Sequence, residues 1–114
     1  MHELTIAKSI VDIAEVEVSR HKGAKVVQIT LQIGALSGIE MEAFNFAWPE
    51  AVRGSLLEGA ECVVERIEGR LRCRRCGTEF AVSEIYELCP ECGSFEHDLT
   101  SGHELRVKSM EIYS

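Results

Sequence analysis

The sequence has no long run of apolar residues and no excess of positive charge. Its first apolar segment is interrupted by Lys8, Asp12, Glu15 and Glu17, so it lacks the roughly 18 to 20 unbroken apolar residues of a membrane span. The same charges argue against a signal peptide. A formal net charge of −7 repels nucleic-acid phosphates over the whole surface. We therefore predict neither a membrane protein nor a nucleic-acid-binding protein.

Catalytic motifs and internal repeats are also missing. No serine or histidine lies in a recognisable nucleophile elbow, and no glycine-rich phosphate loop precedes a predicted helix. We therefore expect a protein that is not an enzyme. The 114 residues do have a globular balance, with 46% hydrophobic and 27% charged residues. This length allows one domain, or one domain with a small appendage.

Hydrophobic periodicity predicts two helices. Apolar residues recur every three or four positions over 4–18, which indicates an amphipathic helix, and the following "RHKG" offers Gly23 as its C-cap. A second apolar stripe predicts a helix that begins near Ser37 and ends near Gly54. Pro49 is expected to kink or split this second helix. Its aromatic residues are expected in the core: Phe44, Phe46 and Trp48.

In three further segments, the pattern of apolar and polar residues is typical of strands. In "KVVQITLQIG", residues 27, 29, 31 and 33 are expected on one face and 26, 28, 30 and 32 on the other. "ECVVERIE" and "ELRVKSMEIY" also predict strands, the latter with a bulge near Ser109 because its apolar phase slips by one residue. The predicted fold class is α+β, with two helices packed on a three-stranded sheet and an inserted zinc-ribbon-like module. The predicted limits are 1–69 plus 103–114 for the α/β domain and 70–102 for the module.

The module contains two C-x-x-C pairs, "CRRC" and "CPEC", separated by twelve residues. Two such knuckles provide the tetrahedral four-thiolate shell that zinc prefers, and a reduced, metal-bound site is favoured over disulfides. Gly77 and Gly93 follow the pairs, where a knuckle benefits from glycine. A filled shell cannot activate water, so the predicted zinc is structural. The predicted zinc ligands are Cys73, Cys76, Cys89 and Cys92.

Other residues near these cysteines have more ordinary interpretations. The arginines of "RLRCRR" are outnumbered by acidic residues in 70–102, and they are expected to offset thiolate charge or to dock an acidic protein partner. His97 and His103 are expected to be solvated loop residues and not extra ligands. The fifth cysteine, Cys62, lies in a predicted strand and is expected to be a small buried apolar residue.

The N-terminus "MHELTIAKSI" offers a second metal site. The bulky His2 should prevent removal of Met1, so the α-amine, the His2 backbone nitrogen and its imidazole can form two fused chelate rings. Nickel(II) and copper(II) favour such square-planar nitrogen donors. The residues alone favour a frayed terminus instead, with Glu3 and Glu40 as acidic residues near helix starts.

Four segments together resemble the HypA/HybF family over essentially the entire chain: "MHELTIAKSI", "IGALSGIEMEAF", "GAECVVE", and the two cysteine pairs with the terminal strand. Members of that family are nickel metallochaperones for the maturation of nickel-iron hydrogenases. The resemblance implies that His2 is the principal nickel ligand and that Met1 contributes main-chain nitrogen. It also implies that Glu3 and Glu40 are possible ligands or orienting groups.

The resemblance further implies a cytoplasmic carrier of one nickel(II) per chain, with structural zinc and no catalysis of its own. The implied partners are a HypB-type GTPase and the hydrogenase large subunit, and the chain is expected to be a monomer or homodimer. Some family members also supply urease. The alternative hypothesis is a zinc-ribbon adaptor that binds protein or nucleic acid and handles no nickel.

Overall fold

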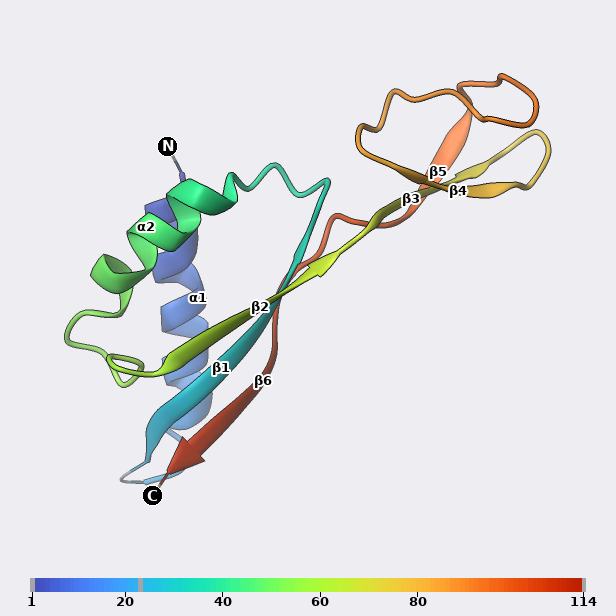
Figure 1. Cartoon of the computed structure of the whole chain (residues 1–114). Helices are drawn as coiled ribbons and strands as arrows, with labels where there is room; N and C mark the ends of the chain where they lie inside the picture. Colours follow the sequence, from blue (N-terminus) through green and yellow to red (C-terminus); the bar gives the residue numbers. More distant parts are fainter. Residues whose placement is uncertain (1, 23, 114) are drawn as a thin grey trace. The chain divides into compact units, whose positions relative to one another are not determined.

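The computed structural model describes residues 2–22 and 24–113, which form two helices and six strands (Figure 1). Contacts divide the chain into two compact units. The first unit comprises 1–31, 39–65 and 106–114, and the second comprises 32–38 and 66–105. The elements are α1 (Glu3–Val18), β1 (Lys25–Gly34), α2 (Met41–Val52), β2 (Glu61–Ile67), β3 (Gly69–Cys73), β4 (Glu79–Val82), β5 (His97–Ser101) and β6 (Leu105–Tyr113).

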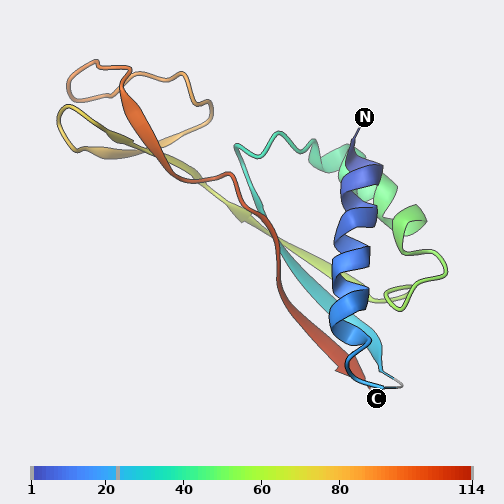
Figure 2. The ribbon, with the colours of Figure 1, turned by 180° about the vertical axis from the view of Figure 1, so that it is seen from behind.

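The first unit contains both helices and most of a three-stranded sheet in the order β2-β1-β6. The helices pack against each other beside the sheet, as Figure 2 shows from behind. Phe44 and Trp48 stack one turn apart on α2, with ring centroids 5.7 Å apart. This apolar burial is the main source of stability for helices of this length. The core side chains of the first unit include Ala7, Ile10, Val11, Ala14, Val18, Val26, Ile29, Leu31, Phe44, Trp48 and Leu57.

The two predicted helices are confirmed, but their ends and one core residue differ from expectation. α1 ends at Val18, and Ser19 occupies the C-cap position with helical dihedrals; the predicted cap Gly23 lies outside the described residues. The second helix was expected to begin at Ser37 or a nearby residue; α2 begins at Met41, and its N-cap is Glu40, which the residues alone had placed near a helix start.

Pro49 lies inside α2, which continues to Val52, so the prediction of a split helix is wrong. A proline lacks only its own N–H donor, so one helical hydrogen bond is lost, while the residues on both sides of Pro49 keep helical conformation. Phe46 is 89% exposed, so its predicted place in the core is also wrong. It lies two residues from both Phe44 and Trp48, and a two-residue step on a helix does not keep a side chain on the same face.

The three predicted strands are confirmed, with one change of phase in β1. Ile29, Leu31 and Ile33 are fully buried as predicted, whereas Val26 is buried and Val27 is 47% exposed, opposite to the prediction. In β6, the half-buried positions are 107, 110 and 112, which reproduces the predicted slip in the apolar phase. The bulge near Ser109 stays a prediction.

The second unit has its own three-stranded antiparallel sheet, in the order β4-β3-β5. Leu71 on the central strand is fully buried and lies opposite Phe80 on β4 and Leu99 on β5. These short strands were not predicted, because they contain few large apolar residues and little alternation. The limits 1–69 plus 103–114 and 70–102 stay predictions about separately folding domains. In the described part of the chain, no helix is long and apolar enough to cross a membrane.

Candidate metal centres

The four paired cysteines come together at one point in the second unit. One potential ligand atom from each of the four lies within 4.8 Å of the others. The Sγ–Sγ separations are 3.5 Å for Cys73 and Cys92 and 3.6 Å for Cys76 and Cys89. Zinc–sulfur bonds of about 2.3 Å give tetrahedral sulfur–sulfur edges of about 3.8 Å, so the spacing fits one zinc ion. All four thiols are free, and no histidine joins this cluster among the described residues.

Backbone hydrogen bonds shape the first knuckle. β3 delivers Cys73 to the site, and its N–H donates to the Thr78 carbonyl at 2.8 Å. The Gly77 N–H donates back to the Cys73 carbonyl at 3.0 Å. Two further N–H groups, from Arg75 and Cys76, point at the Cys73 sulfur at 3.4 and 3.5 Å. The turn therefore places backbone donors around a sulfur atom, which favours its thiolate form.

The second knuckle repeats this pattern. The Cys89 N–H donates to the Ser94 carbonyl and the Gly93 N–H to the Cys89 carbonyl, both at 2.9 Å. The glycines that close the two turns have φ of 78° at Gly77 and 76° at Gly93. These left-handed values are costly for residues with a Cβ, which explains the glycine after each pair.

The polar groups of the first knuckle also change the acidity of its thiols. The Thr78 hydroxyl lies 3.2 Å from the Cys76 sulfur. This hydroxyl and the Thr78 backbone lower the pKa of Cys76 to about 6. The pKa of Cys73 is also lowered, first by the Cys76 backbone N–H. Because metal ligation requires thiolates, these shifts favour metal binding at neutral pH.

The arginines near the first knuckle contact carboxylates, which was not predicted. Arg70 and Arg72 both donate to Glu79, at 2.8 and 3.1 Å, and Arg74 pairs with Asp98 at 2.8 Å. The first pairs join β3 to β4, and the last joins the knuckle to β5. These three guanidinium groups therefore form ion pairs between neighbouring segments of the small sheet. Their partners are among the acidic residues that outnumber the arginines in 70–102, the excess that argued against nucleic-acid binding.

The N-terminal site residues lie where α1 and α2 begin. His2 is exposed and precedes α1, and its carbonyl accepts the first helical hydrogen bond from Ile6 at 2.8 Å. Glu3 is only 9% exposed, and its carboxylate accepts the Glu40 N–H at 3.2 Å. Glu40 in turn accepts the Ala43 N–H at 2.6 Å and caps α2. Met1 lies outside the described residues.

The contact between Glu3 and Glu40 was missed by sequence reasoning, although both residues were candidates. The pKa of Glu3 is lowered to about 2, first by hydrogen bonding to the α-amino group and then by the Glu40 backbone N–H. Glu3 is thus a carboxylate at any neutral pH. A local signal existed only for the cap: Glu40 stands three residues before Ala43 at a helix start, the spacing of a side-chain N-cap, but this spacing does not point to the contact with Glu3.

These features define a metal-binding protein with a four-cysteine site that has no open position for catalysis. The HypA family, described as "Hydrogenase/urease nickel incorporation, metallochaperone, hypA", matches residues 1–112. The chain belongs to this family of nickel metallochaperones and maturation factors, and it is not an enzyme. The family resemblance seen in the sequence and the predicted fold class are both confirmed.

Individual relatives align with this chain over nearly their whole length. "Hydrogenase maturation factor HypA" of Chlorobaculum tepidum is 44% identical over 112 residues, covering 98% of this chain and 99% of that protein. The protein of the same name from Geobacter metallireducens is 43% identical with the same coverage. The solution structure of the nickel metallochaperone HypA from Helicobacter pylori is 25% identical and covers 97% of both chains, with a TM-score of 0.69.

Proposed function

We propose that this chain binds one nickel(II) ion at its N-terminus and delivers it during maturation of a nickel-iron hydrogenase. The proposed donors are the His2 imidazole and backbone nitrogen and the α-amine of Met1. The observation that carries the proposal is the exposed His2 at the start of α1. An exposed terminal site suits transfer, because an incoming ligand can replace the donors one at a time without opening a core.

Glu3 and Glu40 support this site in the proposal. The Glu3 carboxylate is held by the Glu40 N–H, and the Glu40 carboxylate by the Ala43 N–H. The two oxygens of a carboxylate have about four lone-pair sites, so a carboxylate can accept several donors, or donors and a metal, at once. Direct ligation by Glu3 or Glu40 and orientation of the N-terminus by them are both compatible with these contacts. A nickel site with four in-plane donors would need only one further oxygen or water.

The four cysteines are proposed to hold zinc permanently. Their spacing and the backbone donors around Cys73 fit a thiolate zinc site. Zinc bound by four thiolates has no open position, so its role is to fold the second unit. A strong chelator at neutral pH should abolish the amide dispersion of residues 70–102. Unchanged dispersion in zinc-free protein would contradict this assignment.

The proposed partners are a HypB-type GTPase, which would supply nucleotide hydrolysis, and the large subunit of a cytoplasmic hydrogenase, which would receive the nickel. The family description also names urease, so urease is a second candidate destination. The competing function is a zinc-ribbon adaptor that binds protein or nucleic acid and handles no nickel. The net charge of −7 and the pairing of the arginines with carboxylates argue against nucleic acid as its partner.

Nickel titration of the untagged, zinc-loaded protein tests the proposal. Isothermal calorimetry should give one nickel per chain for the wild type, and His2→Ala should abolish or greatly weaken this binding. A glycine inserted before Met1 should do the same, because it moves His2 out of the chelate. His21→Ala is the matched control, since His21 is an exposed histidine just beyond α1. Equal nickel affinity and stoichiometry for wild type and His2→Ala would refute the site.

A further inference from the structure

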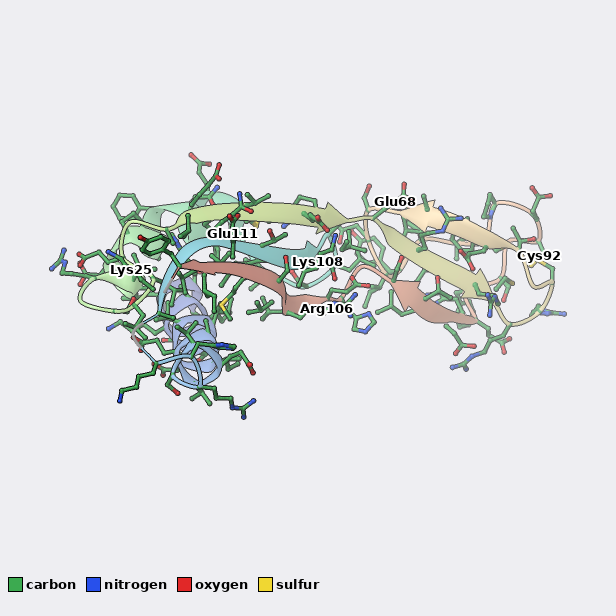
Figure 3. The ribbon with its side chains drawn as sticks, turned by 90° about the horizontal axis from the view of Figure 1, so that it is seen from below. Lys25, Glu68, Cys92, Arg106, Lys108 and Glu111 are labelled. Carbon is green, nitrogen blue, oxygen red and sulfur yellow. The ribbon has the colours of Figure 1, made fainter. Side chains whose placement is uncertain are left out.

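Four large apolar side chains are exposed in one short segment of the second unit. Their exposed fractions are 55% for Ile85, 75% for Tyr86, 58% for Leu88 and 74% for Phe95. All four lie in the connection between β4 and β5. We call this connection, residues 83–96, the knuckle segment, because it carries the second cysteine knuckle; Figure 3 labels Cys92 within it. Exposed apolar side chains that gather in this way are typical of surfaces that bind other molecules.

Hydrogen bonds hold the backbone at both ends of the knuckle segment. At its start, one carboxylate oxygen of Glu87 accepts the N–H groups of Ser83 and Glu84, at 2.7 and 2.9 Å. This contact closes the turn that presents the first two of the four apolar side chains. At its end, the Glu96 carbonyl accepts the Arg74 N–H at 2.9 Å, which ties the segment to the first knuckle.

The second knuckle brings the other two apolar side chains to one end of a turn. The Cys89 N–H donates to the Ser94 carbonyl at 2.9 Å. Leu88 and Phe95 come directly before and after this bonded pair, so both lie where the turn opens. A surface whose backbone is already fixed loses little conformational entropy when a partner covers it.

The knuckle segment is acidic. It contains no lysine, arginine or histidine, and its charged residues are Glu84, Glu87, Glu91 and Glu96. Neither Glu84 nor Glu91 forms an ion pair among residues 2–22 and 24–113. A zinc ion held by four thiolates would add about two further negative charges. The exposed apolar side chains are thus interspersed along the chain with negative charge that no cation of the segment neutralises.

We propose that the knuckle segment docks a basic, apolar segment of another protein, and that it does so only while the cysteine site holds zinc. Covering the four apolar side chains is favourable, and lysine or arginine residues of the docked segment would complement the carboxylates. The same negative charge repels nucleic acid, anionic lipid surfaces and the knuckle segment of a second copy. A cationic polypeptide is the occupant that satisfies both the apolar surface and the charge.

The zinc dependence follows from the position of the ligands, and it rests on the zinc site proposed above. Cys89 and Cys92 lie inside the knuckle segment, and their turn is the one that separates Leu88 from Phe95. Because the second unit buries few large apolar side chains, metal binding is the main source of its stability. Without zinc the turn opens, and the four side chains no longer form one surface. Docking therefore selects chains whose cysteine site is filled.

Selection from a phage-displayed library of random peptides of about 12 residues tests the proposal. The bait is the immobilised full-length, zinc-loaded chain, and soluble Phe95→Ser chain competes for peptides that bind elsewhere. The enriched peptides should carry an excess of lysine and arginine together with aromatic or aliphatic residues. Failure to enrich any peptide over the competitor, or enrichment of neutral or acidic peptides, would overturn the proposal.

Fluorescence anisotropy of one enriched peptide then locates its site. Tyr86→Ser and Glu84→Lys should each weaken binding at least about tenfold. The matched controls are Phe46→Ser and Glu58→Lys, which change exposed residues of the first unit and should bind as the wild type does. Circular dichroism and zinc content check that every variant is folded and loaded. Wild-type affinity in Tyr86→Ser, or an equal loss in the controls, would contradict docking at the knuckle segment.

Two further measurements separate this proposal from its alternatives. A zinc chelator should abolish peptide binding. Binding that survives zinc removal would overturn the zinc dependence, while the variants still report on the docking surface, so failure of the zinc assignment and failure of the docking site are distinguishable. Sedimentation of the chain with phosphatidylglycerol vesicles, if lost in Tyr86→Ser, would identify a lipid-binding surface and would also overturn the proposal.

Discussion

Replacing Gly77 by alanine should weaken zinc binding although no ligand is touched. Gly77 closes the first cysteine knuckle with φ of 78°, and its N–H donates to the Cys73 carbonyl. A Cβ built on Gly77 meets no atom within 4 Å. The substitution therefore introduces no clash, and its whole effect comes from holding a residue with a side chain in the left-handed conformation.

The expected loss of zinc affinity follows from the conformational cost at Gly77 alone. The left-handed conformation costs an ordinary residue about 1 to 2 kcal/mol. Because the zinc-free second unit is expected to lack a stable fold, this cost reduces the free energy of zinc binding directly. At about 1.4 kcal/mol per factor of ten, the dissociation constant for zinc should rise by about 5- to 30-fold. Gly77→Asn should cost less, because asparagine tolerates this conformation better than alanine.

Competition with a chromophoric zinc chelator at pH 7 measures the effect. Gly59→Ala is the matched control, because Gly59 has φ of 85°, also has open space around its Cβ position, and lies in the first unit. It should leave zinc affinity unchanged. Wild-type zinc affinity for Gly77→Ala, or an equal loss for Gly59→Ala, would show that the knuckle conformation is not coupled to the metal as argued.

Three other predictions each compare a side chain that is buried or ion-paired with a similar one that is not. Phe44→Ala should cost about 3 to 5 kcal/mol in urea denaturation, because its side chain is fully buried, while Phe46→Ala should stay within about 0.5 kcal/mol. Glu79→Gln should speed amide exchange in β3 and β4 of the zinc-loaded protein at pH 7, whereas Glu84→Gln, outside those ion pairs, should not. Burial raises the pKa of Cys62 from 9.0 to about 11, so the folded state favours its thiol; this stabilisation is present below pH 9 and is lost between about pH 9 and 11. Its alkylation by iodoacetamide at pH 8 should be roughly a hundredfold slower than that of a free cysteine, and a rate equal to the free thiol would contradict the burial.

The helices and strands of the first unit could be predicted because their periodicity reflects one-sided burial. The errors have local causes. Phe46 is aromatic and adjacent to a core stripe, yet a step of two residues turns it away from Phe44. Ser37 is a better N-cap type than Glu40, but Glu40 caps α2 while its own N–H is taken up by Glu3. That contact joins residues 37 apart in sequence, and no local rule could supply it.

The four-cysteine site could be predicted because the short spacing of the cysteines within each pair determines most of its geometry. Each C-x-x-C pair and its following glycine form a turn by themselves, and the structure adds only the meeting of two such turns. The sheet that carries them was not predicted, since β3, β4 and β5 are short and polar. Their pairing is accompanied by cross-strand ion pairs such as Arg70 with Glu79, which are visible only once the strands are side by side.

The four-cysteine site and the proposed nickel site differ in how tightly the fold encloses a bound ion. The four cysteine sulfurs, two of them on buried residues, would surround a zinc ion, and backbone hydrogen bonds within each turn fix their positions. Release of a zinc ion from this site would therefore require both turns to open. In the proposed nickel site, the buried Glu3 anchors the start of α1 to the start of α2, while the adjacent His2 stays exposed. An anchor that sits beside the donors, and not around them, holds the terminus in place without enclosing the ion, so the ion can leave while the fold stays intact.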